Sequence, residues 1–443
     1  MRDLSLLLAL LLMTPVAILY PAAGFVAWVW FSIESPHEMV YSFAAGKPLS
    51  SVIAVATLVG WVLHRGDKRW PGDAVPWLVL FLYVWISFNQ LFVPFREYSY
   101  DYWNLFSRTF IEIFLAFFLL NTKARIQGVV WAMIIGLGFY GVKGGAFTII
   151  TAGHSLVWGP PGTQIADNNQ LALAVVMVLP LVYYAMRSTV QRWLRVALGI
   201  AIVLQVIMVF GTYSRGGVIA LGTMMFIVWL RSDRKFLYAI LGCALLAVGL
   251  SIMPSQFWVR LHTLQNVEGD SSFMGRVEAW RVAIDYATDH FPFGAGYYAL
   301  QLPELFHAYL PQAAPHAAHS IYFQVLGEHG FIGFALYIAA LFFGLRNAWI
   351  VIRQTRGQPG LEWAHDLADM SRVSLIAYLL GGAALSVAYF DGYLLQFAIL
   401  SNLRRMTARS RLPAAPLAEE LLPRPRQVAA DEPVPAAGMA FDV

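Results

Sequence analysis

Long apolar runs separated by short polar connections follow one another along almost the whole chain. They lie at about residues 50–64, 75–91, 108–121, 126–150, 170–186, 193–210, 216–230, 236–253, 319–352, 372–390 and 393–403. Most are roughly 15 to 25 residues long, as a helix needs in order to cross a hydrocarbon layer about 30 Å thick. The pattern therefore predicts an all-α polytopic membrane protein.

The composition agrees with this class. Hydrophobic residues make up 59% of the chain and charged residues only 13%, which leaves too little polar surface for a soluble globule of this length. The net charge of +4 reflects the connections between spans, and we expect no nucleic-acid partner. The single cysteine, Cys243, excludes an intrachain disulfide and argues against a structural zinc site.

Basic clusters on alternate connections set the predicted orientation, because such clusters stay in the cytoplasm. The clusters are Arg65/Lys68/Arg69, Lys123/Arg125, Arg187/Arg192/Arg195, Arg231/Arg234/Lys235, Arg346/Arg353/Arg356 and Arg404/Arg405/Arg409/Arg411. Arg2 also favours a cytoplasmic N-terminus, so residues 4–49 must cross an odd number of times. We expect one crossing, kinked near Pro15 and Pro21, which gives about 12 spans with both termini cytoplasmic.

This topology divides the chain into four segments. They are 1–253 with spans one to nine, 254–318 as a helical outer loop, 319–403 with spans ten to twelve, and 404–443 as a cytoplasmic tail. The loop is too long for a bare connector, and "GDSSFMGRVEAWRVAIDYATDH" predicts a helix capped near Asp270, with Arg276, Trp280 and Ala283 on one face. The tail is rich in proline and alanine without an apolar period, which predicts disorder.

Cations are scarce on the predicted outer side, so each one there is a candidate for a functional role. Arg215 lies in "TYSRGG", where Gly216 and Gly217 allow close approach of backbone or ligand; it either binds an anion or snorkels at the end of a span. Lys143, in "FYGVKGGAF", is costly in the outer half of its span unless it is paired or faces water. Arg276 is either a site residue or an ordinary charge on an amphipathic helix.

His319 begins the tenth predicted span, at the outer boundary with water. An imidazole there titrates near neutrality and can act as a general base, although a polar cap of the helix is the simpler alternative. His316 raises the possibility of a metal pair, but no outer cluster has recognisable ligand spacing, so we predict no metal. Glu328 and His329 lie deeper, among glycines, where we expect an interrupted or closely packed helix and a buried structural hydrogen bond.

The residues around His319 resemble a known family. His319 and Ser320, followed after nine residues by Gly330 and then by Gly333, match the pattern H-[NSQ]-x9-G-x-x-[GTY] of bacterial O-antigen ligases. "TYSRGG" in a short outer connection, "SSFMGRVEAWRVA" and "FPFGAGYY" in the long loop, and the number of spans are similar to the same family. The resemblance covers nearly the whole chain except the tail, and "GVKGGAFTIITAGHSLVWGPPGTQIADNNQLALA" resembles O-glycosylation ligases found beside exosortase systems.

The resemblance implies a multi-pass enzyme of the bacterial inner membrane with a periplasmic active site and no cofactor. Its members transfer a glycan from undecaprenyl diphosphate to a lipid A-core sugar, to another repeat unit or to a protein hydroxyl. We expect the first of these, ligation in lipopolysaccharide biosynthesis, with polymerisation or protein glycosylation as alternatives. The partners would be the lipid-linked donor, the lipid A-core acceptor and membrane lipids.

The residues fit that chemistry. Arginine forks suit a departing diphosphate, which makes Arg215 and Arg276 the catalytic cations and the diphosphate ligands. Lys143 and Arg281 are expected to support them. His319 would take the proton of the acceptor hydroxyl from the opposite face, which inverts the anomeric carbon.

Several polar and aromatic residues are candidates for contacts with the sugar or the acceptor. They are Asp167, Asn168, Asn169, Tyr213, Trp280 and His316. The run from Asp167 to Asn169 lies where an outer loop enters a span, so these residues either hold sugar hydroxyls or cap the helix.

Two other classes of protein compete with the enzyme. A lipid-linked glycan transporter would also have many spans and intramembrane charges, but it should show internal repeats with broken helices in both halves, and the sequence has no self-similar pair. A non-catalytic lipid-binding or scaffold protein would tolerate the loss of His319.

Overall fold

The computed structural model describes the chain over residues 2–40, 47–64, 66, 68–252 and 271–409. The chain is all-helical, and the described residues contain no strand. Two predictions lie outside these residues: the cap at Asp270 and the tail from residue 410 onward.

The first part of the chain supplies ten helices and a short 3-10 turn. They are α1 Arg2–Leu19, α2 Pro21–Glu34, η1 Pro36–Met39, α3 Leu49–Leu63, α4 Ala74–Asn89, α5 Arg96–Leu119, α6 Lys123–Ile150, α7 Asn168–Ser188, α8 Arg192–Gly211, α9 Arg215–Arg231 and α10 Lys235–Ile252. Most begin and end within a few residues of the predicted apolar runs. The long outer loop and the last spans follow as α12 Ser271–Asp289, η4 Ala299–Gln301, α13 Pro303–Tyr309, α14 Ile321–Thr355, α15 Glu362–Gly382 and α16 Asp391–Arg409.

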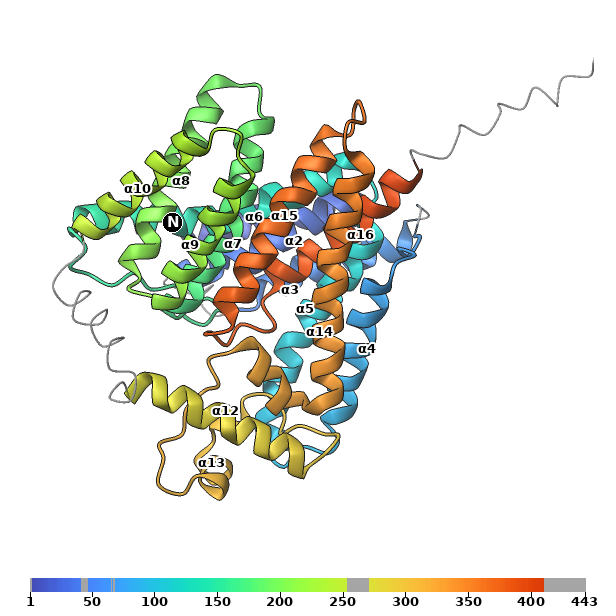
Figure 1. The fold of residues 1–443 in the computed structure, drawn as a ribbon. Helices are drawn as coiled ribbons and strands as arrows, with labels where there is room; N and C mark the ends of the chain where they lie inside the picture. The colour runs from blue at the N-terminus through green and yellow to red at the C-terminus, as the bar shows by residue number, and fades with distance from the viewer. Residues whose placement is uncertain (1, 41–46, 65, 67, 253–270, 410–443) are drawn as a thin grey trace, which may run out of the picture.

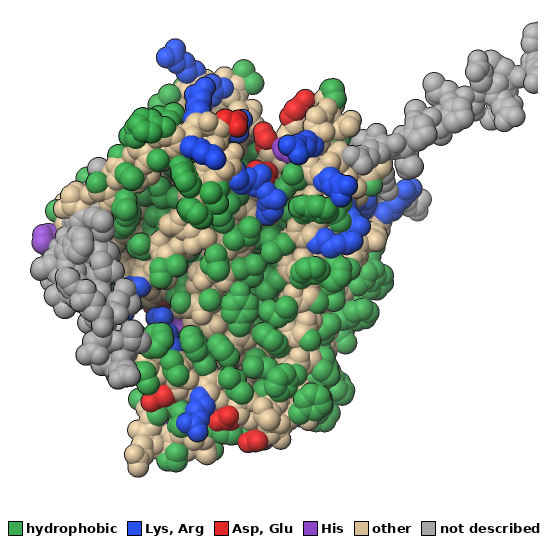
Figure 2. All heavy atoms as spheres, in the orientation of Figure 1, with side chains coloured by type: hydrophobic (Ala, Val, Ile, Leu, Met, Phe, Trp, Pro, Cys, Tyr) green, Lys and Arg blue, Asp and Glu red, His purple; other side chains and the backbone are tan. Residues whose placement is uncertain are grey.

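Length and composition identify part of this bundle as membrane-spanning. Helices α6, α7, α8 and α14 are long and apolar enough to cross a bilayer, and α1, α3, α4 and α10 contain shorter apolar stretches. Figure 2 shows hydrophobic side chains over a broad band of one face, with many Lys and Arg side chains at the end away from α12. The structure thus gives a membrane protein, while the total of about 12 spans stays a prediction.

Helix α12 lies across one end of the bundle, together with α13 (Figure 1). We call this the α12 end. Ala283 of α12 is fully buried and packs at the position of Gly327 in α14, which confirms that the predicted face of α12 is its packing face. Helices α4, α5 and α14 reach this end (Figure 1).

Four helices differ from the predicted boundaries. Helix α15 spans Glu362–Gly382, where the apolar run predicted residues 372–390. The break near the N-terminus falls at Tyr20, directly before Pro21, whereas α1 continues through Pro15. Helix α5 begins at Arg96, well before the expected apolar run, because its first turns lie at the α12 end. Helix α16 continues to Arg409, so the helical part extends beyond the predicted boundary at residue 403.

Candidate functional site

Three chain segments meet at the α12 end: the start of α7, the turn between α8 and α9, and the approach to α14. Asn168 donates a side-chain hydrogen bond of 2.7 Å to the carbonyl oxygen of Thr212, which ties the first two together. Gln170 donates one of 3.4 Å to the carbonyl oxygen of Ser386, which links α7 to the segment between α15 and α16.

The turn between α8 and α9 folds as the polar residues of "TYSRGG" require. Tyr213 adopts a left-handed backbone with φ of 56°. Ser214 caps α9 by accepting a hydrogen bond of 3.0 Å from the amide of Gly217. A Cβ at Gly217 would lie 2.6 Å from that of Ala172 in α7, so glycine is needed for this contact. Arg215, half-buried, is therefore fixed as the first residue of α9.

Helix α12 holds the backbone next to His319. The indole nitrogen of Trp280 donates a hydrogen bond of 2.6 Å to the carbonyl oxygen of Ala318, and the ring stacks on Phe323 with centroids 4.9 Å apart. His319 itself has a left-handed backbone with φ of 42° and is half-buried. His319 therefore lies outside the regular geometry of α14, which begins at Ile321.

The neighbours of His319 favour its neutral form. Burial lowers the pKa of the His319 imidazole, and the Arg276 guanidinium and His316 lower it further, while the Asp167 carboxylate opposes them. These interactions bring Asp167, Arg276 and His319 together in one cluster. Figure 2 shows Lys, Arg and His side chains in the recess between α12 and the rest of the bundle.

His316 packs over the start of α12. A Cβ at Gly275 would meet the His316 ring at 2.6 Å, and the His316 side chain is otherwise exposed. The histidine therefore lies beside the cluster, at its rim. Among the described residues, no group of three His, Cys, Asp or Glu side chains is placed to hold a metal ion.

Lys143 and Arg281, the predicted supporting cations, make their contacts along their own helices. Lys143 is exposed and lies over the Phe139 ring, 5.7 Å from its centroid. Arg281 is 71% exposed and pairs with Asp285 at 3.5 Å. Because five residues separate Arg281 from Arg276, the two point to different faces of α12, and the structure does not bring Arg281 into the cluster.

The polar residues at the start of α7 serve as a cap. Asp167 accepts a hydrogen bond of 2.8 Å from the amide of Asn169, and another of 3.0 Å from its side chain. The Tyr213 hydroxyl donates to the carbonyl oxygen of Gly153. The cap alternative is thus confirmed for Asp167, while contacts of these residues with sugar stay a prediction.

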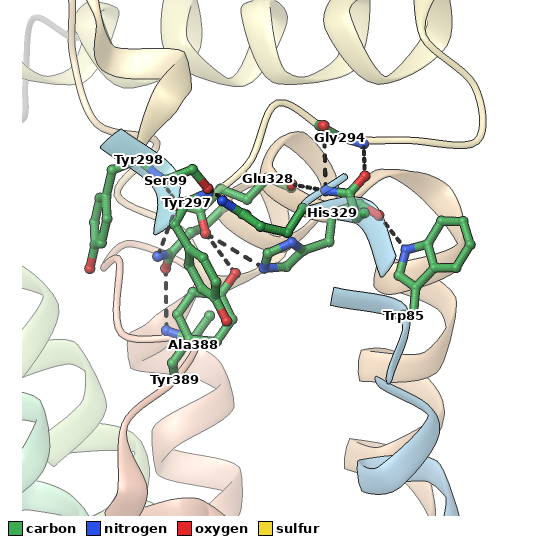
Figure 3. Close-up of polar contacts among 12 residues, drawn as sticks. Trp85, Ser99, Gly294, Tyr297, Tyr298, Glu328, His329, Ala388 and Tyr389 are labelled. Carbon is green, nitrogen blue, oxygen red and sulfur yellow. Dashed lines mark hydrogen bonds and ion pairs between the residues drawn. The ribbon is translucent and has the colours of Figure 1, made fainter. Parts of the chain in front are cut away.

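Helix α14 is broken at Gly330, deeper than His319. Gly330 has φ of 68° and ψ of −172°, a conformation open to glycine. The break frees the preceding carbonyl groups. The amides of Ala295 and Gly296 donate hydrogen bonds of 2.9 Å to the carbonyl oxygens of Gly327 and Glu328, respectively. The indole of Trp85 donates one of 2.8 Å to the carbonyl oxygen of His329 (Figure 3). The interruption predicted from the glycines is confirmed.

Glu328 is a structural acceptor in this region. Its carboxyl group accepts hydrogen bonds from the Tyr389 hydroxyl at 2.6 Å and from the amide of Tyr298 at 3.1 Å. The side-chain amide of Gln324 also donates a hydrogen bond of 3.4 Å to Glu328. The Nε2 atom of His329 lies 4.0 Å from the Glu328 carboxyl group. The buried hydrogen bonding expected here is confirmed for Glu328.

Sequence reasoning missed two groups of residues. The Asn89 side chain accepts a hydrogen bond of 3.0 Å from the amide of Gly294 and donates one of 3.1 Å to the carbonyl oxygen of Glu328. In the sequence, the only indication of this role was that Asn89 is a polar residue at the end of an apolar run. Glu112 and Asp391 are both buried. Glu112 had a clear signal, since a carboxylate within the apolar run "TFIEIFLAFF" is costly without a partner.

Taken together, the structure shows a helical membrane protein with an arginine, an imidazole and a carboxylate gathered at the α12 end. Residues 200–338 match the family model described as O-antigen ligase, so the chain carries a domain of the O-antigen ligase family and the predicted resemblance is confirmed. Residues 1–190 match a family of unknown function, DUF5935. A search of curated proteins found no match.

The matched region contains the main elements of the cluster. It includes Arg276 and His319 of the cluster, and also Arg215 and Trp280. The start of α7, with Asp167, belongs to the region matched by the family of unknown function. The family supports a glycosyltransferase of the ligase or polymerase type.

Proposed function

We propose that the protein transfers a glycan from undecaprenyl diphosphate to a sugar of the lipid A core, as an inverting, metal-independent O-antigen ligase. The observation that carries the proposal is the cluster at the α12 end. A neutral imidazole and an arginine lie together there, and Trp280 holds the backbone next to the imidazole. The O-antigen ligase domain supports the same class of reaction.

In this mechanism His319 is the general base. It accepts the proton of the acceptor hydroxyl as that oxygen forms its bond to the anomeric carbon. The bond from the anomeric carbon to the diphosphate oxygen breaks on the opposite face, so the configuration inverts. Undecaprenyl diphosphate leaves with the bonding electron pair.

Arg215 and Arg276 stabilise the negative charge that grows on the leaving diphosphate. A planar guanidinium offers two parallel donors to phosphate oxygens, and preorganised charge near a bilayer is worth more than in bulk water. The cap at Ser214 fixes the backbone of Arg215, and helix α12 fixes that of Arg276. In our topology this site faces the periplasm.

A transfer assay that compares possible acceptors identifies the one that the protein uses. Purified protein in proteoliposomes is given a labelled undecaprenyl-diphosphate glycan with lipid A core, with a candidate acceptor protein, or without either. Labelled lipid A core is the expected product. Longer lipid-linked glycan without added acceptor would identify a polymerase, and labelled protein would identify an oligosaccharyltransferase.

His319→Ala tests the mechanism and separates the enzyme from a transporter or a scaffold. The variant should lose transfer but still bind the lipid-linked donor, whereas Arg215→Ala should lose donor binding. Substantial transfer by His319→Ala, or an equal loss of donor binding in both variants, would contradict the assigned roles.

A further inference from the structure

A second cavity, of about 670 Å³, lies between α2, α3 and α5. Its walls also include the loop at residues 162–165, Tyr298 of the outer segment, and Asp391 at the start of α16. Cavities of this size accommodate small organic ligands, whose usual range is about 300 to 1,000 Å³. None of the chemistry assigned to His319 uses this space.

Buried carboxyl groups line the cavity. Glu112 is 1% exposed, and its Oε1 atom has no hydrogen-bond partner among the described residues. Asp391 is also buried and accepts a hydrogen bond of 3.0 Å from the Ser32 hydroxyl. A buried carboxyl oxygen without a partner is costly, so a ligand that donates hydrogen bonds at this point would be bound strongly.

The cavity opens on an apolar surface of the bundle. Val55, Leu105 and Ile111 belong to its lining and are 58%, 45% and 40% exposed. Lipid would cover such side chains in a membrane protein. A ligand with a polar head and an apolar anchor could therefore enter from the side, with its head among the carboxyl groups.

Two segments connect this cavity with the cluster around His319. Tyr298 lines the cavity and also a small pocket whose other walls include His316 and Ala318. The loop at residues 162–165 leads directly to Asp167, which interacts electrostatically with His319. The cavity thus shares the Tyr298 wall with a pocket lined by residues just before His319.

The charges in the cavity select the ligand. Glu38, Glu112 and Asp391 line it and offer no positive charge to a diphosphate, whereas carboxyl groups beside aromatic rings suit sugar hydroxyls. The two cations of the lining, Lys47 and Arg108, are exposed. The cavity therefore favours a hydroxyl-rich head over the anionic head of the donor.

We propose that this cavity binds the sugar head of a membrane-anchored acceptor, with Glu112 and Asp391 accepting hydrogen bonds from its hydroxyl groups. The inference rests on the proposed glycan transfer and deepens it, because it assigns the second substrate to the class of glycolipids. Donor and acceptor then approach His319 from different parts of the bundle.

The first test fills the cavity without touching the cluster. Ala54 of α3 lines the cavity, and Val52 lies on the same helix, is 45% exposed and is outside the lining. Ala54→Phe should raise the acceptor KM at least about tenfold, with an unchanged donor KM, whereas Val52→Phe should resemble the natural protein in both. A raised donor KM with an unchanged acceptor KM would overturn the proposal.

The second test removes the carboxylate but keeps the shape of the side chain. Glu112→Gln removes one carboxyl oxygen that can accept from a sugar hydroxyl, so it should raise the acceptor KM about tenfold, while the binding of a short polyprenyl diphosphate stays unchanged. An unaltered acceptor KM in both Glu112→Gln and Ala54→Phe would overturn the assignment.

Direct binding separates this inference from the proposed function. The purified full chain in lipid nanodiscs is titrated with dodecyl glucoside and, for comparison, with dodecyl phosphocholine. Preferential binding of the glucoside that Ala54→Phe abolishes and Val52→Phe retains supports the site, even if no glycan transfer is found. Equal binding of the two amphiphiles, or full glucoside binding by Ala54→Phe, would show that the cavity does not select sugar.

Discussion

His319 owes its expected reactivity to the residues around it. A histidine at the start of a span would ordinarily be a polar cap, but its left-handed backbone takes it out of the helix, and the side chain interacts electrostatically with Arg276 and Asp167. Burial and Arg276 lower its pKa, so the imidazole is neutral, and able to accept a proton, over a wider pH range than a free histidine.

The pH dependence of transfer tests this environment. Since the neutral form is the base, kcat/KM should be constant near neutral pH and fall as pH decreases through the His319 pKa, which lies below the ordinary value of about 6.5. Arg276→Gln removes a cation that lowers this pKa, so the remaining activity should fall at a higher pH than in the natural protein. An acidic limb unaffected by Arg276→Gln would argue against His319 as the titrating group.

The two arginines should require their guanidinium geometry. Arg215→Lys and Arg276→Lys keep the charge but lose the bidentate fork, so each should reduce kcat/KM by about 10 to 100-fold, the equivalent of one or two charge-assisted hydrogen bonds. Thermal unfolding should change little because both side chains are only half-buried.

Arg281 provides the comparison on the same helix. Its exposed pair with Asp285 predicts a much smaller effect for Arg281→Lys, measured by the same transfer assay. Comparable losses in all three variants would indicate a general effect of charge on donor attraction instead of a specific diphosphate site.

At the scale of elements, the Trp280 indole of α12 holds the backbone just before α14. Trp280→Phe keeps a ring that can stack on Phe323 but removes the hydrogen bond to Ala318. Because a small displacement of a base is expensive for proton transfer, we expect kcat to fall about tenfold, with an unchanged donor KM.

Trp103→Phe is the matched control for that change. Trp103 also donates one hydrogen bond, of 3.0 Å, to the hydroxyl of Ser87, but it lies in α5. Its variant should keep the natural kcat. If both variants lose kcat to the same extent, the loss belongs to general stability and not to the position of His319.

The break in α14 depends on Gly330. Alanine there would be strained by the positive φ, and its Cβ would collide with the backbone of Pro292 and Phe293. Gly357 has nearly the same φ, 69°, but no atom lies within 4 Å of an added Cβ. Gly357→Ala should therefore cost about 1 kcal/mol of unfolding free energy, and Gly330→Ala at least about 3 kcal/mol.

Thermal unfolding of the two variants in one detergent measures this difference. A lower midpoint for Gly330→Ala than for Gly357→Ala is expected. Equal midpoints would mean that the outer segment moves away from α14 at little cost, and that the contacts around Glu328 do not hold the two together.

At the scale of the whole molecule, the proposed chemistry uses the protein's own cations. Among the described residues no group of acidic, histidine or cysteine side chains is placed to hold a metal ion. Transfer should therefore survive exhaustive treatment with EDTA. A loss of turnover that added Mg²⁺ or Mn²⁺ restores would refute the metal-independent mechanism.

The assembly of the site illustrates how far sequence reasoning reaches. The pattern around His319 and the "TYSRGG" motif pointed to His319 and Arg215 as candidates, because the residue types themselves carry the chemistry. The partners that adjust that chemistry come from other helices. Asp167 precedes α7, Trp280 belongs to α12, and Tyr298 links the cluster to the second cavity.

The sequence by itself determined the class of the protein and most of its helices, since apolar runs of sufficient length form helices wherever they pack, and Pro21 and Gly330 marked two of their breaks. It also identified the family through residues close together along the chain. The tertiary structure decided which charges act together: Arg276 joins His319 whereas Arg281 turns away, and Glu112 meets Asp391 across a cavity. The physical reason is that burial, electrostatic neighbours and the sharing of hydrogen bonds depend on distances in space, which a one-dimensional pattern does not contain.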